Sequence, residues 1–138
     1  MAAFILDCSI TLAWFFTDEQ DAYADSIAAN FPNAGALVPE HWSLEVTNTM
    51  TVGERRNRCT VQQSTAFIQY LDALVIIRDH ETERRAWADT LALVRKHSMT
   101  SYDAAYLELA VRERLPIATL DQKLLAAALA EGISAFQP

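Results

Sequence analysis

Two aspartates follow short apolar runs that are typical of buried strands. Asp7 comes directly after residues 4–6, and Asp121 comes directly after residues 117–120. In an open parallel sheet, ligands bind outside the carboxyl ends of the strands. Both carboxylates are therefore predicted to lie at the edge where such a sheet binds its ligands.

Two further carboxylates lie on the apolar or aromatic side of a predicted helix. Asp103 is in the first turn of one helix and shares a face with Tyr106 and Leu107. Glu45 is on another helix, four residues after His41. The four acids come from four separate segments, and we expect them to meet at one edge of the sheet.

Carboxylates that lie close together repel one another. Two of them about 5 Å apart repel by roughly 3 kcal/mol at an effective dielectric constant near 20. Such a cluster must protonate, spread apart or bind a cation. A ligand set made only of oxygen atoms selects a hard ion, so we expect Mg²⁺ or Mn²⁺. A carboxylate-held ion of this kind suits the hydrolysis of phosphodiester bonds.

Each acid also has a simpler structural explanation. Asp7 and Asp121 are suited to cap the helices that follow them, and Thr100 is suited to cap the helix of Asp103. Glu45 fits an ordinary helix surface. These explanations account for carboxylates at helix starts, but they do not account for four of them around one sheet edge, so the cation site is favoured.

The elements that position these residues alternate between short apolar runs and amphipathic helices. Strands are predicted at residues 3–6, 36–38, 74–77 and 116–120. Helices are predicted at residues 9–16, 21–31, 41–55, 61–71, 81–97, 101–112 and 122–130. In the helix at 81–97, Trp87, Leu91 and Val94 share one face. This order predicts a three-layer α/β/α domain with a central, mostly parallel sheet.

Composition narrows the class of protein. The chain has 138 residues, a formal net charge of −7 and 51% hydrophobic residues, which predicts one globular domain over residues 1–138. No apolar stretch is long enough to span a membrane, and the first residues do not resemble a signal peptide. Cys8 and Cys59 show no pairing pattern, so we expect a reducing cytoplasm. The acidic balance excludes nucleic-acid binding by bulk charge alone.

Four ordered segments resemble the PIN-domain ribonucleases, and most closely the VapC-type toxins of toxin–antitoxin pairs. They are residues 5–9 (ILDCS), 38–46 (VPEHWSLEV), 101–106 (SYDAAY) and 118–121 (ATLD). The resemblance implies a PIN-like α/β fold and a metal-dependent endoribonuclease. It also implies an RNA substrate, a homodimer and a cognate antitoxin protein that holds the enzyme inactive.

The same resemblance assigns roles to individual positions. The acidic metal-binding and catalytic residues correspond to Asp7, Glu45, Asp103 and Asp121. Ser9 and Thr119 stand where small hydroxyl residues help to position metal, water or carboxylates. The resemblance does not divide the four carboxylates into separate acid and base roles, or fix whether one or two ions bind.

Basic residues close to these motifs are candidates for contact with RNA phosphates. Arg55, Arg56 and Arg58 form the densest basic group, and Lys123 follows Asp121 closely. The alternative is a solvated helix end, where arginine also suits the helix dipole. Two interpretations are open for His41. It either packs against its neighbours, which is the favoured interpretation, or it supports Glu45.

Three other functions share parts of this pattern. A haloacid-dehalogenase-like phosphatase needs a second aspartate where this chain has Ser9, and a phosphorelay receiver needs an acidic pair where it has Asp7 and Cys8. The third is a catalytically silent PIN-like module that binds RNA or an antitoxin. The presence of all four acids argues against it, because a protein that does not cut has no chemical need for the complete set.

Overall fold

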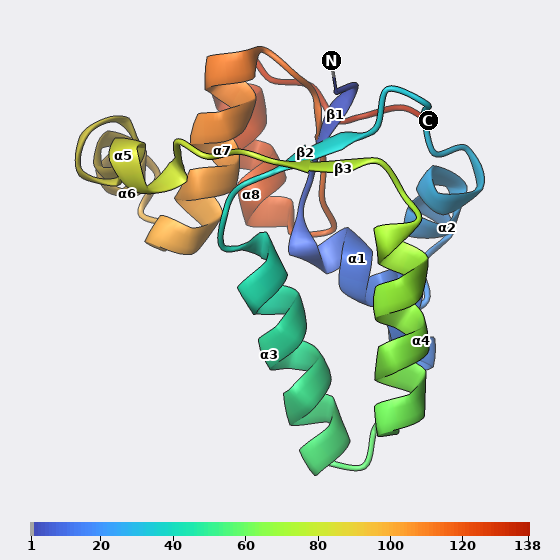
Figure 1. Cartoon of the computed structure of the whole chain (residues 1–138). Helices are drawn as coiled ribbons and strands as arrows, with labels where there is room; N and C mark the ends of the chain where they lie inside the picture. The colour runs from blue at the N-terminus through green and yellow to red at the C-terminus, as the bar shows by residue number, and fades with distance from the viewer. Residues whose placement is uncertain (1) are drawn as a thin grey trace.

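A four-stranded parallel sheet forms the centre of the computed structural model, which describes residues 2–138 (Figure 1). Met1, the first residue of the predicted domain, lies outside the described residues. The strands are β1 (Phe4–Leu6), β2 (Ala36–Val38), β3 (Ile76–Arg78) and β4 (Ile117–Ala118), in the spatial order β3-β2-β1-β4. In the register, Phe4 lies opposite Ala36, and Ile5 lies opposite both Leu37 and Ile117. All three residues of β1 are fully buried, as a strand covered on both faces requires.

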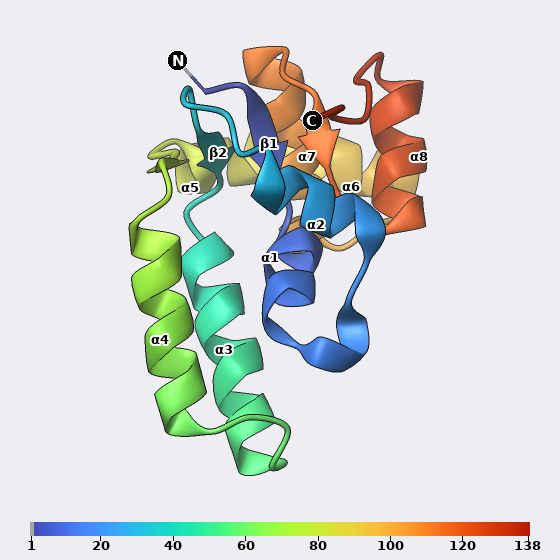
Figure 2. The ribbon, with the colours of Figure 1, turned by 90° about the vertical axis from the view of Figure 1, so that its right-hand side faces the viewer.

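Helices cover the sheet on both faces. They are α1 (Cys8–Phe15), α2 (Ala22–Ala29), α3 (Trp42–Arg55), α4 (Val61–Asp72), α5 (Thr82–Arg85), α6 (Leu91–His97), α7 (Ser101–Glu113) and α8 (Gln122–Ala130), with the short turns η1 (Thr17–Glu19) and η2 (Ala86–Thr90). Figures 1 and 2 show α7 and α8 on one side of the sheet and α1 and α2 on the other. In both views α3 and α4 run side by side away from the sheet. The predicted three-layer α/β/α architecture is confirmed.

Local capping explains where α7 and α8 begin and end. The Thr100 hydroxyl accepts a hydrogen bond from the backbone N–H of Asp103 at 3.2 Å, which starts α7 as predicted. Asp121 caps α8 in the same way. Gly132, with φ of +80°, follows α8 as its predicted stop. These caps place Asp103 and Asp121 at the starts of their helices.

Two predicted strands are shorter than expected or displaced. The strand expected at 74–77 is β3 at Ile76–Arg78, because the backbone of Leu74 is still held by Leu71 in the turn that leaves α4 (N···O 3.1 Å). The strand expected at 116–120 is only β4, because the Thr119 hydroxyl bonds the backbone N–H of Asp121 and turns the chain. Both changes come from hydrogen bonds at the strand ends.

The helix predicted over residues 81–97 is interrupted. The five residues of η2 form a π-helical turn between α5 and α6. A π turn adds a residue to the helical repeat and so rotates the faces on either side of it. Trp87 is 92% exposed, whereas Leu91 and Val94 are half-buried, so the prediction that the three residues share one face of a continuous helix is wrong.

One glycine is required by a close approach of two strands. Gly35 has φ of +82°, and a Cβ atom there would lie 2.2 Å from the carbonyl oxygen of Val75. Glycine therefore allows β2 to begin beside the segment that enters β3. Within residues 2–138, no helix combines the length and the apolar character needed to cross a membrane.

Candidate active site

The candidate site lies at the point where the strand order reverses. β1 has β2 on one side and β4 on the other, and Asp7 follows β1 directly. Asp121 follows β4 after the turn at Thr119. The crevice outside the carboxyl ends of two such strands is the usual ligand site of a doubly wound sheet. The four carboxylates Asp7, Glu45, Asp103 and Asp121 are called the acidic cluster below.

Asp7 is held by two hydroxyl groups. Ser9 Oγ donates to Asp7 Oδ2 at 2.5 Å, and Thr119 Oγ1 donates to the same oxygen at 2.7 Å. The two hydroxyls lie 3.3 Å apart, and Ser9 Oγ also accepts the backbone N–H of Leu120 at 2.9 Å. Asp7 makes no side-chain cap to α1, so the capping explanation is wrong for this residue. These bonds tie the start of α1 to the end of β4.

The pKa of the Asp7 carboxyl is raised above its ordinary value. Burial is the largest cause, and the negative charge of Asp103 adds to it, while the hydroxyls of Ser9 and Thr119 act in the opposite direction. The neighbouring thiol of Cys8 is also buried, and its pKa is raised far above its ordinary value. Cys8 is therefore protonated at neutral pH and suits packing rather than nucleophilic attack.

Asp103 and Asp121 lie at the starts of two neighbouring helices. Oδ1 of Asp121 accepts the backbone N–H groups of Lys123 and Leu124 at 2.9 and 3.2 Å, so the capping explanation is correct for this residue. These two bonds engage only one of its carboxylate oxygens. Burial and then the charge of Asp121 raise the pKa of Asp103, partly offset by Thr100 and by the positive charge of Lys123. Asp103 thus lies within electrostatic reach of both Asp121 and Lys123.

Glu45 is fixed by a residue from α7. The phenolic O–H of Tyr106 donates to Glu45 Oε1 at 2.6 Å. Burial raises the pKa of Glu45 to about 7, and the charges of Asp7 and Asp103 add to the effect, while the Tyr106 hydrogen bond reduces it. Burial and the nearby Glu45 charge also keep the pKa of Tyr106 well above its ordinary value, so Tyr106 is a donor throughout the neutral range.

His41 contacts both Glu45 and the start of α7. Its Nε2 lies 3.1 Å from the carbonyl oxygen of Tyr102 and 3.3 Å from Glu45 Oε1. Because a carbonyl oxygen only accepts, Nε2 carries a proton. Burial lowers the pKa of His41, so near pH 7 this contact joins Glu45 to a neutral imidazole. The contact with Glu45 goes beyond the simple packing favoured from the sequence.

The acidic cluster shares one electrostatic environment. The charge of Asp103 raises the pKa values of Asp7 and Glu45, the charge of Asp7 raises that of Glu45, and Asp121 raises that of Asp103. Across residues 2–138, no three His, Cys, Asp or Glu side chains lie close enough together to form a ready ligand set. The charge of Asp103 thus acts on Asp7 and Glu45, and Asp103 in turn is affected by Asp121.

Comparison with solved structures identifies the fold. PAE2754 from Pyrobaculum aerophilum aligns with a TM-score of 0.67 and 19% identity, covering 91% of this chain and 79% of its own. VapC20 from Mycobacterium tuberculosis, described as a sarcin–ricin loop cleaving toxin, aligns with a TM-score of 0.66 and 19% identity, covering 99% of this chain and 100% of its own. The chain has a PIN-like fold. No protein-family model and no curated protein matches the sequence.

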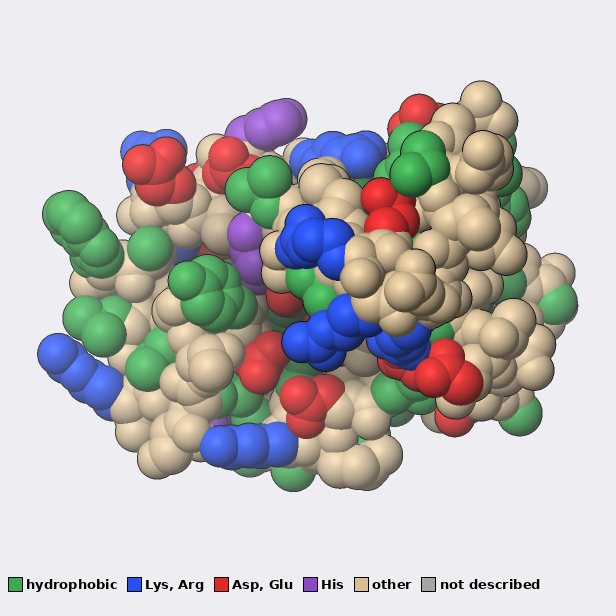
Figure 3. Space-filling view, turned by 90° about the horizontal axis from the view of Figure 1, so that it is seen from below, with side chains coloured by type: hydrophobic (Ala, Val, Ile, Leu, Met, Phe, Trp, Pro, Cys, Tyr) green, Lys and Arg blue, Asp and Glu red, His purple; other side chains and the backbone are tan. Residues whose placement is uncertain are grey.

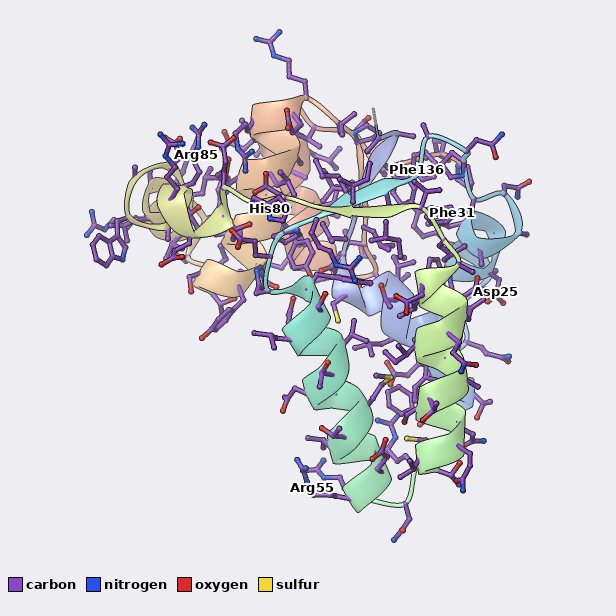
Figure 4. The ribbon with its side chains drawn as sticks, in the orientation of Figure 1. Asp25, Phe31, Arg55, His80, Arg85 and Phe136 are labelled. Carbon is purple, nitrogen blue, oxygen red and sulfur yellow. The ribbon has the colours of Figure 1, made fainter. Side chains whose placement is uncertain are left out.

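Within the PIN-like fold, the predicted basic residues fall into two places. Lys123 lies beside the acidic cluster, and its Nζ donates to the carbonyl oxygen of Ser98 at 2.7 Å. Arg55 and Arg56 are exposed at the far end of α3, about 15 Å along the helix from Glu45 (Figure 4). In the part of the chain that the structure describes, neither arginine makes an ion pair.

Arg58, the third arginine of that group, already forms ion pairs within the protein. Arg58 pairs with Asp18 at 3.0 Å and with Glu19 at 2.9 Å, and its guanidinium lies 4.0 Å from the ring centre of Phe16. Figure 3 shows this end of the molecule, where acidic and basic side chains lie close together on one face. Arg58 serves to hold η1 against the α3–α4 connection.

Tyr106 is the contact residue that sequence reasoning missed. Its place on the face of Asp103 was visible in the sequence, but its hydrogen bond joins residues 61 positions apart. Ser9 and Thr119 lie where the motif resemblance implied, next to Asp7. The PIN-like fold thus supplies Asp7 and Glu45 with a hydrogen-bonding side chain from a distant part of the sequence, Thr119 for Asp7 and Tyr106 for Glu45.

Proposed function

We propose that this chain is a metal-dependent endoribonuclease and the toxin of a toxin–antitoxin pair. The observation that carries the proposal is the electrostatic coupling of Asp103 with Asp7, Glu45 and Asp121, which come from four separate segments. The fold likeness to VapC20, which is described as a toxin that cleaves the sarcin–ricin loop, supports the same function.

The donor set fits a hard divalent cation. Asp7, Glu45 and Asp103 all have raised pKa values, and neighbouring negative charge contributes to each. A cation among them would remove this repulsion, and carboxylate oxygens are the ligands that Mg²⁺ and Mn²⁺ prefer. The acidic cluster would hold the ion, with its protein ligands drawn from those four residues.

The side chains of the site prepare it for hydrolysis of a phosphodiester bond. When bound, the cation polarises the phosphate and lowers the pKa of a water molecule. Ser9 and Thr119 hold the Asp7 carboxylate in one orientation, and Tyr106 does the same for Glu45. Glu45, whose pKa is raised to about 7 in the free protein, would release its proton on becoming a ligand of the cation.

The proposed substrate is single-stranded or looped RNA. A chain with a net charge of −7 cannot attract RNA by overall charge, so local groups must do so. Lys123 beside the acidic cluster, and Arg55 with Arg56 at the far end of α3, are the proposed phosphate contacts. Their separation suits a strand that extends along α3 from the site.

Cleavage of RNA tests the proposal. We expect cleavage with Mg²⁺ or Mn²⁺, none with EDTA, and a loss of at least 100-fold in Asp7→Asn and Asp103→Asn. Asp25→Asn is the matched control, because Asp25 is exposed on α2, away from α3 and α7 (Figure 4). Undiminished cleavage by both site variants would contradict the proposal. Binding of RNA without any cleavage would instead support the catalytically silent PIN-like module.

The toxin role carries two proposed protein partners. One is a cognate antitoxin, and the other is a second copy of the chain in a homodimer. We expect growth arrest when the chain is expressed alone, relieved by co-expression of the antitoxin and absent for Asp7→Asn. Light scattering of the purified protein measures the homodimer, and a monomer mass at all concentrations would contradict that part.

A further inference from the structure

Two exposed apolar side chains lie at the rim of the acidic cluster. Tyr102 directly precedes Asp103 in α7 and is 64% exposed, and Leu44 directly precedes Glu45 in α3 and is 72% exposed. A single exposed apolar residue is normal on a protein surface. An exposed aromatic ring next to a residue of the acidic cluster is a candidate contact for a ligand with a flat apolar face.

His41, which directly precedes α3, contacts Tyr102 of α7. Its ring centre lies 5.9 Å from that of Tyr102, and its Nε2 bonds the Tyr102 carbonyl oxygen. Leu44 follows His41 by three residues on α3, so these two side chains are neighbours on the helix. The rings of His41 and Tyr102 are inclined by 52°, and Tyr102 remains mostly in solvent. His41 therefore supports Tyr102 without covering it.

The position of Tyr102 relative to Asp103 suits a nucleotide. Consecutive residues of an α-helix point about 100° apart. A ligand whose phosphate is held at the acidic cluster by the proposed cation can place the base of an adjoining nucleotide beside Tyr102, because Tyr102 is the neighbour of Asp103 in α7. Unpaired bases of RNA are commonly held by stacking on aromatic side chains, which is tolerant of sequence because every base has a flat face.

We propose that Tyr102, supported by His41, is a stacking subsite for an unpaired nucleobase next to the bond that is cleaved. This inference rests on the proposed ribonuclease function and adds a substrate-binding residue to it. It selects single-stranded or looped RNA, because a base inside a duplex is already stacked and cannot reach the ring. The subsite holds the base, and the acidic cluster acts on the phosphate.

Two kinds of measurement test the subsite. Binding of a short single-stranded RNA is measured by fluorescence anisotropy in the Asp7→Asn background, and cleavage is measured in the wild-type background. We expect Tyr102→Ala to raise Kd and KM about tenfold with a smaller change in kcat. Tyr102→Phe keeps the ring and should stay within twofold of the parent protein. Trp87→Ala, which removes a 92% exposed aromatic residue on η2, should leave Kd and KM unchanged.

RNA with a single abasic nucleotide, moved through the positions that flank the cleaved bond, provides the decisive comparison. One abasic position should weaken binding about as much as Tyr102→Ala does, and the two changes together should cost no more than either alone. Equal losses from Tyr102→Ala on intact and abasic RNA at every position would overturn the subsite. So would equal losses in Tyr102→Phe and Tyr102→Ala, because the hydroxyl and not the ring would then be responsible.

Other outcomes separate the subsite from the function on which it rests. Wild-type protein that cleaves RNA while Tyr102→Ala cleaves and binds it equally well overturns the subsite alone. If Tyr102→Ala leaves RNA binding intact but weakens antitoxin binding, Tyr102 is a protein contact and the subsite is wrong. Wild-type protein that neither cleaves nor binds RNA overturns both the function and the subsite. Thermal unfolding of each variant confirms that the fold is retained.

Discussion

The phenolic oxygen of Tyr106 lies 2.6 Å from Oε1 of Glu45, and it joins α7 to α3 inside the candidate site. Tyr106 is fully buried, so its ring is held by the core while its hydroxyl reaches the carboxylate. The hydrogen bond favours the charged form of Glu45 against the opposing effect of burial. One buried phenol thus orients a proposed catalytic carboxylate and favours its charged form against the larger effect of burial.

Tyr106→Phe is expected to raise the pKa of Glu45 further above about 7, because it removes the hydrogen bond that favours the carboxylate. The acidic limb of the pH–rate profile for RNA cleavage should move to higher pH, and the rate at pH 7 should fall about tenfold. Tyr23→Phe is the matched control, because its hydroxyl bonds the carbonyl oxygen of Phe136 at 2.7 Å. Identical profiles for the two variants would show that Tyr106 does not act through Glu45.

Binding of Mg²⁺ should become tighter as the pH rises through about 7. Glu45 is partly protonated there in the free protein, and a cation must displace that proton. Calorimetry in buffers of different ionisation enthalpy should show proton release on binding at pH 6.5 and much less at pH 8.5. In Glu45→Gln the pH dependence around 7 should disappear, and its persistence there would assign the proton to another group.

Asp103→Asn is expected to stabilise the metal-free protein at pH 7 while abolishing cleavage. Burial and the Asp121 charge raise the pKa of Asp103, so ionising it costs stability in the folded state. A raised carboxyl pKa means that stability falls as the pH rises above the ordinary value of 3.8. We therefore expect a gain in melting temperature of about 2–4 °C at pH 7 and none below pH 3.8. Asp25→Asn should change nothing at either pH, and a melting temperature lowered by Asp103→Asn would exclude repulsion at this site.

Arg112→Met should destabilise the fold by about 3 kcal/mol at pH 7. Arg112 bonds Asp79 at 2.9 Å and Glu108 at 2.9 Å, and removing it leaves two buried carboxylates unpaired. Burial acts to raise the pKa of Asp79, but the bonds and charge of Arg112 outweigh it and hold that pKa below its ordinary value.

The sign of that shift fixes the pH dependence of the Arg112→Met effect. A lowered carboxyl pKa gives stability above the ordinary value of 3.8 that is lost as the pH falls. Urea unfolding should therefore show a smaller difference between the variant and wild type at pH 3 than at pH 7. Arg95→Met, which removes an exposed arginine of α6, is the control and should lie within about 0.5 kcal/mol of wild type. A difference that does not change with pH would indicate lost packing rather than lost charge pairing.

Replacing both Arg55 and Arg56 with alanine should weaken RNA binding at low salt and reduce its salt dependence. Each lost phosphate contact on a single strand lowers the slope of log K against log salt concentration by about 0.7. The measurement is RNA titration at several salt concentrations in the Asp7→Asn background. Arg114→Ala, at the end of α7 opposite Asp103, is the control. Equal slopes for the parent protein, the double variant and Arg114→Ala would show that Arg55 and Arg56 do not contact the RNA.

Much of the arrangement around the site follows from local patterns. Apolar runs that end in Asp7, or shortly before Asp121, predicted parallel strands with carboxylates beyond their ends, and the structure has both. Helical spacing put Asp103 on the side of Tyr106, and the Thr100 cap was visible from residue type. These features depend on residues a few positions apart, so the sequence alone expresses them.

The errors arose where a hydrogen bond at a strand end or an inserted turn changed a local pattern. The π turn at η2 turned Trp87 outward, and the Thr119 hydroxyl shortened β4. An argument from periodicity assumes 3.6 residues per turn along the whole helix, so it cannot predict the extra residue of a π turn. Sequence alone therefore placed the elements in the right order with some wrong ends.

Amino-acid order by itself determined the PIN-like fold class and the strand ends and helix faces on which the four carboxylates lie. Only the tertiary structure decided their partners: Tyr106 for Glu45 at a separation of 61 residues, and Thr119 for Asp7 at 112. Helix and strand periodicity assigns a side chain to a face of its own element. Which side chain meets it there depends on how whole elements pack, and that information is spread over the entire core.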